Sequence, residues 1–172
     1  GSYNSYAALS THGDGLTLRC AGPESVLSIT GDQGGEATVL FSIDPSAERT
    51  VIEGCTMRGR DMTNTHEQTH AIVTSGVCAG ETCRPIVDVT IRDVTCDWPY
   101  DVPIDGAPRA RKGDCVKLLG NAPETEVTRV RIVGSGLSGA RAAITIQRGI
   151  HDLVVAGNTL HWRNWDFHVR LD

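Results

Sequence analysis

Two short segments of alternating apolar and polar residues recur in register along this chain. The first reads VIEGCTM, TIRDVTC, RIVGSGL and VVAGNTL at residues 51–57, 90–96, 131–137 and 154–160. Its partner segment reads HAIVT, DCVKL, AAITI and FHVRL. Recurrence every few tens of residues is typical of one structural unit stacked on itself, with each unit burying its apolar face against the next. The sequence therefore predicts a solenoid of short strands.

Alignment of these segments without gaps places apolar side chains in shared columns. The main columns are Ile52, Ile91, Ile132 and Val155; Met57, Cys96, Leu137 and Leu160; Ile72, Val116, Ile144 and Val169; and Thr74, Leu118, Ile146 and Leu171. Polar residues alternate with them, which is the two-residue period of a strand with one buried face. The spacing varies because loops are inserted into a bare coil. We expect an all-β fold, a single-stranded parallel β-helix of few coils with long loops on one side.

The corners between the paired strands carry a family resemblance. In VVAGNTLHW and VTIRDVTCDW a Gly or an Asp separates two strands, and SITGDQGGEATVLFSID and AERTVIEGCTMRG precede them. In these runs the chain resembles the right-handed parallel β-helix superfamily, which includes pectate-lyase-like proteins and phage tailspikes. The resemblance implies a right-handed β-helix over residues 14–172. We expect residues 1–13 to form an N-terminal cap or linker, and the opening Gly-Ser resembles a cloning remnant.

Composition narrows the expected partners. The 172-residue chain has a net charge of −5 and lacks the basic stripe that nucleic-acid binding requires, so we expect no nucleic-acid partner. No stretch approaches the ~20 apolar residues that span a bilayer, so we expect no membrane insertion. The 19 glycines suit tight corners with positive φ.

The six cysteines point to an oxidising compartment. Cys78 and Cys83 bracket a short loop of small residues, which predicts a disulfide between them, with two free thiols as the alternative. Cys115 falls on an outward column without an obvious partner. The other three fall on inward columns, where a thiol behaves as a small hydrophobe: Cys20, Cys55 and Cys96. We expect an extracellular or virion-surface location.

Loops that run from the first segment to its partner should form one continuous loop wall, because equivalent loops of a solenoid emerge on one side. These loops cover residues 58–69, 97–113, 138–141 and 161–166, and they hold all three tryptophans. Exposed rings beside Arg and Asp suit a polysaccharide, since sugar C–H faces pack on rings and Arg binds carboxylates bidentately. The residues expected to contact it are Trp98, Tyr100, Arg109, Arg111, Arg141, Trp162, Arg163 and Trp165.

Two other interpretations of the loop wall stay open. Trp98 and Trp162 could fold back over the coil edge and cap it. The loop wall could also form a subunit contact, because Tyr, Trp and Arg are enriched at interfaces. By resemblance, tailspike-like β-helices are commonly homotrimers. The last strand ends at FHVRLD with no cap after it, so we expect a homotrimer or part of a longer chain.

Asp114 is the best candidate for catalysis, because it begins a partner strand that would hold it rigidly. His70 occupies the corresponding position one coil earlier, which predicts that the two lie ~5 Å apart in stacked strands and shift each other's pKa. Asp101 and Asp105 could supply the second carboxylate that glycoside hydrolysis needs. The alternative is that His70 and Asp114 simply terminate strands through hydrogen bonds.

The catalytic motifs of the superfamily are absent. The chain has no paired Asp-Asp, Gly-His-Gly or Arg-Ile-Lys of the polygalacturonase type and no WIDH-like run of the pectate-lyase type. We expect no cofactor, although the oxygen-rich loops would allow Ca2+. The sequence favours a polysaccharide-binding domain of a tailspike-like viral or surface-displayed protein. The alternatives are a polysaccharide lyase or glycoside hydrolase using Asp114, and a purely structural segment of a tail fibre or adhesin.

Overall fold

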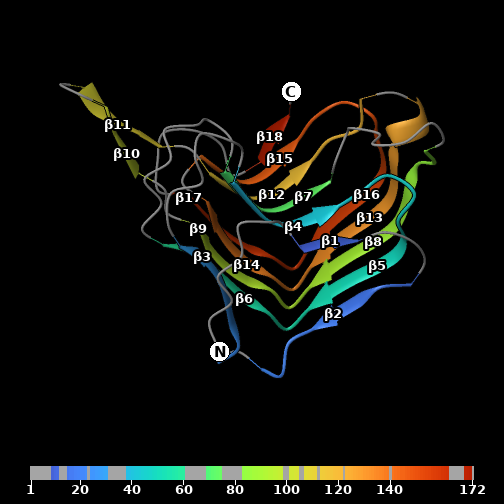
Figure 1. Cartoon of the computed structure of the whole chain (residues 1–172), viewed down its shortest axis with the longest axis horizontal. Helices are drawn as coiled ribbons and strands as arrows, with labels where there is room; N and C mark the ends of the chain where they lie inside the picture. The colour runs from blue at the N-terminus through green and yellow to red at the C-terminus, as the bar shows by residue number, and fades with distance from the viewer. Residues whose placement is uncertain are drawn as a thin grey trace.

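Strands dominate the part of the chain that the structure, a computed structural model, describes. This part comprises residues 9–11, 15–22, 24–30, 38–60, 69–74, 83–98, 101–104, 107–111, 113–121, 123–139, 141–162 and 169–171. Within it the only helix is a single 3-10 turn, η1 (Pro123–Thr125). All other elements are strands, arranged in three parallel sheets and one antiparallel hairpin (Figure 1).

The three parallel sheets are built from strands far apart in sequence. Sheet B contains, in spatial order, β16 (Ile150–Ala156), β13 (Val127–Val133), β8 (Ile86–Arg92), β5 (Glu48–Glu53) and β2 (Thr17–Arg19). Sheet C contains β17 (Thr159–Trp162), β14 (Gly136–Gly139), β9 (Thr95–Trp98), β6 (Thr56–Arg60) and β3 (Val26–Thr30). Sheet A contains β1 (Leu9–Thr11), β4 (Thr38–Ile43), β7 (Thr69–Thr74), β12 (Asp114–Leu118), β15 (Ala142–Ile146) and β18 (Val169–Leu171).

The chain visits these sheets in a repeating order. It passes from sheet B to sheet C to sheet A, as in β5, β6 and β7, and then returns to sheet B at β8. Each strand pairs in parallel with the equivalent strand of the neighbouring coil, so the ribbons lie in stacked layers (Figure 1). Three all-parallel sheets connected in this way have the layout of a parallel β-solenoid.

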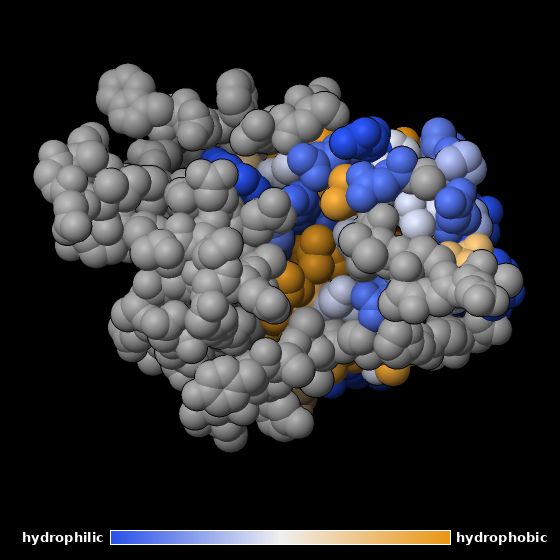
Figure 2. Space-filling model, turned by 45° about the horizontal axis from the view of Figure 1, so that its top comes forward, coloured by the Kyte–Doolittle hydropathy of each residue, from blue (hydrophilic) through white to orange (hydrophobic). Residues whose placement is uncertain are grey.

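The core consists of the columns that the alignment predicts. Ile91 pairs in register with Ile52 on one side and Ile132 on the other, and Ile132 pairs with Val155. Val116 pairs likewise with Ile72 and Ile144. Cys96 pairs with Met57 and with Leu137, so the predicted register is confirmed in sheets A, B and C. Most of these aliphatic side chains are fully buried, and Figure 2 shows apolar residues bordered by hydrophilic ones on one face of the molecule.

The corner between sheets B and C is made, in four successive coils, by one residue in the left-handed conformation. These residues are Gly54, Asp93, Gly134 and Gly157, with φ between 53° and 65°. Glycine adopts positive φ without steric cost, and Asp tolerates it better than most residues. The predicted Gly or Asp corners are thus confirmed.

A second left-handed column kinks the strands of sheet B. It contains Arg49, Asp88, Arg129 and Asp152, with φ between 52° and 59°. Positive φ is uncommon outside glycine, so its recurrence at equivalent positions shows that the kink is a regular feature of the coil. The charges alternate in sign along the column, and Arg129 binds Asp88 through two hydrogen bonds of 2.6 and 2.9 Å.

The cysteine chemistry differs from the prediction. Cys96 and Cys115 form a disulfide, and Cys115 is completely buried, so its expected outward position is wrong. The reason is that β12 is covered on both faces, with all five residues buried. A second disulfide joins two further cysteines that were expected as inward thiols, Cys20 and Cys55. Cys83 is disulfide-bonded, while Cys78, its predicted partner, lies outside the described residues.

One segment expected as a cap or linker and one expected as a loop contain strands. Leu9–Thr11, within the expected cap, forms β1 and pairs with β4 in sheet A. The long loop over residues 97–113 contains an antiparallel hairpin of β10 (Asp101–Ile104) and β11 (Ala107–Arg111). The hairpin is an insertion between β9 and β12 and leaves the parallel stacking unchanged.

Candidate functional site

The junction between sheets C and A is the region where the sequence predicts function. There the strands β6, β9, β14 and β17 end, and β7, β12, β15 and β18 begin, so every insertion between them leaves from stacked ends. Four predicted site residues lie outside the described residues: Tyr100, Asp105, Arg163 and Trp165. Four more lie on described strands, but their side chains are not described: Asp101 on β10, Arg109 and Arg111 on β11, and Trp162 on β17.

Trp98 belongs to the core. Its side chain is completely buried at the end of β9, so the expectation that it stands exposed on the loop wall is wrong. The alternation of β9 explains this, because Cys96 and Trp98 face inward while Thr95 and Asp97 are at least partly exposed. The same two-residue period could have revealed it from the sequence. Its indole Nε1 has no hydrogen-bond partner among the residues that the structure describes.

His70 and Asp114 stack on neighbouring strands at the junction, as predicted. They are register partners in β7 and β12, and His70 Nδ1 lies 3.2 Å from Asp114 Oδ2. Both side chains are almost completely inaccessible to solvent. Within the described part of the chain, neither ring nitrogen of His70 has a partner with hydrogen-bond geometry, so the contact with Asp114 is a close approach only.

Arg141 completes this cluster from the next coil. It immediately precedes Ala142, the register partner of Asp114 in β15. Its guanidinium donates to both carboxylate oxygens of Asp114, with a distance of 3.0 Å from Nε to Oδ1 and a shorter contact from a terminal nitrogen to Oδ2. We call His70, Asp114 and Arg141 the junction cluster. The sequence carried the signal for Arg141, since its position one residue before the strand follows from the register.

The electrostatics of the junction cluster oppose proton transfer by Asp114. Burial would raise the pKa of Asp114, but the contacts from His70 and Arg141 outweigh burial and hold that pKa below its usual range. Burial lowers the pKa of His70 by more than the contact with Asp114 raises it, and the positive charges of Lys117 and Arg141 add to the lowering. Asp114 is therefore an ionised carboxylate paired with Arg141, beside a neutral imidazole. A general acid needs a raised pKa and access to the substrate, so the catalytic roles of His70 and Asp114 stay predictions.

A polar column runs along the exposed face of sheet C toward the junction. Asp97 pairs in register with Arg58 on one side and Ser138 on the other, and Ser138 pairs with His161. Arg58, Asp97 and Ser138 are partly exposed and His161 is exposed. We call these four residues the sheet C column. It presents one hydrogen-bonding side chain per coil, just before the insertions.

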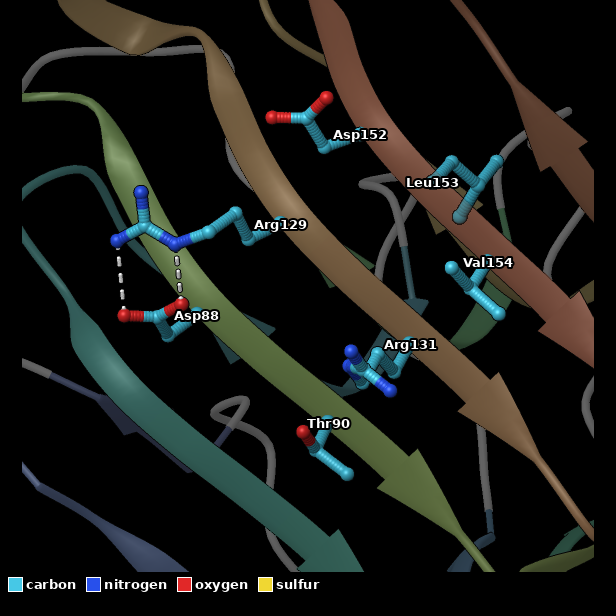
Figure 3. A pocket seen from close by; sticks show the side chains of 7 residues that line it. All are labelled: Asp88, Thr90, Arg129, Arg131, Asp152, Leu153 and Val154. Atoms are coloured by element: carbon cyan, nitrogen blue, oxygen red, sulfur yellow. Dashed lines mark hydrogen bonds and ion pairs between the residues drawn. The ribbon is translucent and has the colours of Figure 1, made fainter.

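A groove of about 460 Å³ lies on the outer face of sheet B. Its lining comes from β8, β13 and β16 and combines two acidic residues, two arginines, a hydroxyl and two aliphatic side chains: Asp88, Thr90, Arg129, Arg131, Asp152, Leu153 and Val154 (Figure 3). Arg129 is occupied by Asp88. Arg131 is exposed and makes no ion pair within the described part of the chain.

Neither a metal centre nor a membrane helix emerges from the described residues. Among them, no three His, Cys, Asp or Glu side chains are grouped so that they could hold a metal ion. Within the same ranges, no helix has the length and hydropathy needed to cross a bilayer.

The fold places this protein in the class of all-β proteins that are built from stacked parallel strands. Comparison with protein-family models, curated protein sequences and solved structures found no match.

Proposed function

We propose that this chain is a right-handed parallel β-helix domain of a tailspike-like viral or surface-displayed protein, and that it binds polysaccharide along the junction. The observation that supports this most is the sheet C column, which repeats a polar side chain in four successive strands beside the insertions. Adjacent strands of a sheet lie about 4.8 Å apart, so the column offers hydrogen-bonding groups at regular intervals. A polymer of repeating sugar units is a ligand with matching regularity.

The chemistry of the column suits a saccharide. Arg58 donates up to five hydrogen bonds in a planar fork and recognises sugar carboxylates bidentately. Asp97 accepts hydrogen bonds from hydroxyl groups, and Ser138 and His161 can both donate and accept. The insertion that follows β17 carries Trp165 by sequence, a residue type that packs on sugar rings.

An extracellular or virion-surface location is part of this proposal. It is supported by the disulfides Cys20–Cys55 and Cys96–Cys115, because disulfides persist mainly in oxidising compartments.

Affinity electrophoresis in gels that contain an acidic or a neutral polysaccharide tests the proposal. We expect the wild-type protein to be retarded by at least one polysaccharide. The substitutions Arg58→Gln and Asp97→Asn should each weaken retention about tenfold or more, because a lost hydrogen bond to a charged group costs about 1.5 kcal/mol. Arg148→Gln, at an exposed arginine outside the column, should leave retention unchanged and serves as the matched control.

Three other outcomes would contradict the proposal. If Arg131→Gln abolishes retention while Arg58→Gln does not, the groove on sheet B is the binding site. If no polysaccharide retards the protein, the structural alternative gains support. If chromatography shows that the polysaccharide is shortened and Asp114→Asn prevents this, the chain is a lyase or hydrolase.

A further inference from the structure

The outer face of sheet B carries charges that alternate in sign from coil to coil. The residues that flank these charges are register partners in β5, β8, β13 and β16, so the charges form one column. Its members, all at least partly exposed, are Arg49, Asp88, Arg129 and Asp152. We call these four residues the charged column. Figure 3 shows three of them, with the bond that joins Asp88 to Arg129 across two strands.

A second outward column runs beside the charged column. Thr90 pairs in register with Val51 on one side and Arg131 on the other. Arg131 pairs in turn with Val154. The groove is lined by members of both columns (Figure 3). Arg131 makes no ion pair within the described part of the chain, and the side chain of Val154 is 42% exposed. A single molecule therefore leaves a cation and an aliphatic side chain exposed on this face.

Two copies of this face are complementary when a twofold axis parallel to the strands relates them. Such an axis reverses the order of the coils. An axis between β8 and β13 sets β5 against β16 of the second copy, and β8 against β13. The charged column then faces itself in reverse, with Arg49 opposite Asp152 and with Asp88 opposite Arg129. In the second column, the exposed Val154 lies opposite an aliphatic partner on β5, Val51.

Other positions of the axis oppose like charges or lose contacts. An axis through β8 would set Asp88 against Asp88, and an axis through β13 would set Arg129 against Arg129, which disfavours both arrangements. An axis between β5 and β8 would keep unlike charges together. In that case Gly15 would stand opposite Arg129, and Val154 would stay uncovered. The axis between β8 and β13 is thus the one that opposes all four charges and covers Val154.

The same arrangement places an arginine of the second copy at the groove. Arg131 lies opposite Thr90, and Asp88 precedes Thr90 by two residues on the groove side of β8. Facing sheets pack about 10 Å apart, a gap that the long side chain of arginine can span. A carboxylate has lone pairs for more than one donor, so Asp88 can bind Arg131 of the second copy while it keeps its own Arg129.

We propose that two copies of this chain form a dimer through the outer faces of sheet B, about a twofold axis between β8 and β13. The contact is isologous and closes at two copies, because both molecules use the same residues. Four strands of six or seven residues present roughly 400 Å² on each copy. A standard interface buries about 800 Å² per partner, so this dimer is weak, and its charged contacts make it sensitive to salt. The proposal does not depend on polysaccharide binding at the junction.

Charge reversals at the two ends of the charged column give a sharp test. Sedimentation velocity of the wild-type protein, over a series that reaches millimolar concentration, should show a dimer that weakens as salt is added. Asp152→Arg sets an arginine against Arg49 twice in each dimer, and Arg49→Asp sets a carboxylate against Asp152 twice. Each variant alone should therefore raise the dissociation constant about tenfold or more. Both changes in one chain restore unlike charges and should restore the dimer. An equimolar mixture of the two single variants should also dimerise, because each copy supplies the charge that the other needs.

Controls separate misfolding and other surfaces from this contact. Both substitutions introduce a residue type that the charged column already holds at positive φ, so we expect folded variants, and urea midpoints check this. Glu124→Arg, on the exposed turn η1, is the matched reversal outside sheet B and should dimerise as the wild type does. A wild-type protein that is monomeric at every concentration overturns the proposal. A dimer that neither single reversal weakens also overturns it, and so does a double variant that stays monomeric although the wild type dimerises. The assay contains no glycan, so its outcome is independent of the proposed function.

Discussion

Cys96 on β9 and Cys115 on β12 are joined by a disulfide that crosses the junction between sheets C and A. The bond links positions 19 residues apart and encloses the hairpin β10–β11. The strands on both sides of the longest described insertion are therefore held together by a covalent bond as well as by their ladders. The insertion can present its side chains without loosening the core.

Removing this bond should destabilise the protein. The double substitution Cys96→Ser with Cys115→Ser should lower the free energy of unfolding by about 3 kcal/mol, because closing a loop of this length restricts the unfolded chain. Urea titration under oxidising conditions measures the difference. With dithiothreitol present in both samples the difference should largely vanish, and a difference that persists would mean that packing of the cysteines dominates.

Replacing Asp114 should leave the positive charge of Arg141 without its carboxylate partner in the interior. Asp114→Asn removes the charge that neutralises Arg141, and breaking a buried ion pair in this way costs about 3 kcal/mol of unfolding free energy. Asp152→Asn, at an exposed carboxylate, is the control and should change stability by less than about 0.5 kcal/mol. Equal effects of the two substitutions would show that the junction cluster adds nothing to stability.

Acidification should weaken the fold through His70. Because burial lowers the pKa of His70 in the folded protein, the unfolded chain takes up the proton first as the pH falls through about 6.5. Stability should therefore be greatest above pH 6.5 and decline toward the lower pKa of the folded state. Asp114 adds a further loss only below about pH 4, since its folded pKa is lowered as well.

Urea midpoints measured from pH 8 to pH 5 check this dependence. His70→Gln should flatten the decline between pH 7 and pH 5, whereas His151→Gln, at an exposed histidine, should retain it. A wild-type protein that becomes more stable over the same interval would show that His70 is protonated beside Asp114 in the folded state.

Two glycines of β14 should respond in opposite ways to a methyl group. A Cβ at Gly139 would lie 1.8 Å from the carbonyl oxygen of Ala142 and 3.1 Å from that of Gly113, and backbone atoms cannot yield easily. Gly139→Ala should therefore cost more than about 2 kcal/mol. A Cβ at Gly136 would meet no atom within 4 Å, so Gly136→Ala should be neutral or slightly stabilising. Thermal melting of both variants makes the comparison.

The sequence predicts the scaffold better than the site, and particular residues show why. The register of Ile52, Ile91 and Ile132 follows from hydrophobic repetition, which is a property of the sequence alone. The Cys96–Cys115 bond escaped prediction because it depends on how sheet C turns into sheet A, and no periodicity encodes that turn. Composition groups Trp98 with the other loop rings, whereas the alternation of its own strand places it in the core. His70 and Asp114 were paired correctly because column positions fix neighbours between coils.

The side chain of Asn158 forms hydrogen bonds with the backbone of the coil that precedes its own. Its side-chain oxygen accepts a hydrogen bond of 2.8 Å from the backbone N–H of Ser135, and its amide donates to the carbonyl oxygen of Ile132 at 2.7 Å. The backbone groups at one corner are thus satisfied by a residue that arrives about a full turn later along the chain. The chain is synthesised from its N-terminus, so the two hydrogen bonds at that corner form only after the following turn has left the ribosome. A gene duplication that copies this corner must likewise include Asn158 from the following turn if the same backbone groups are to stay satisfied.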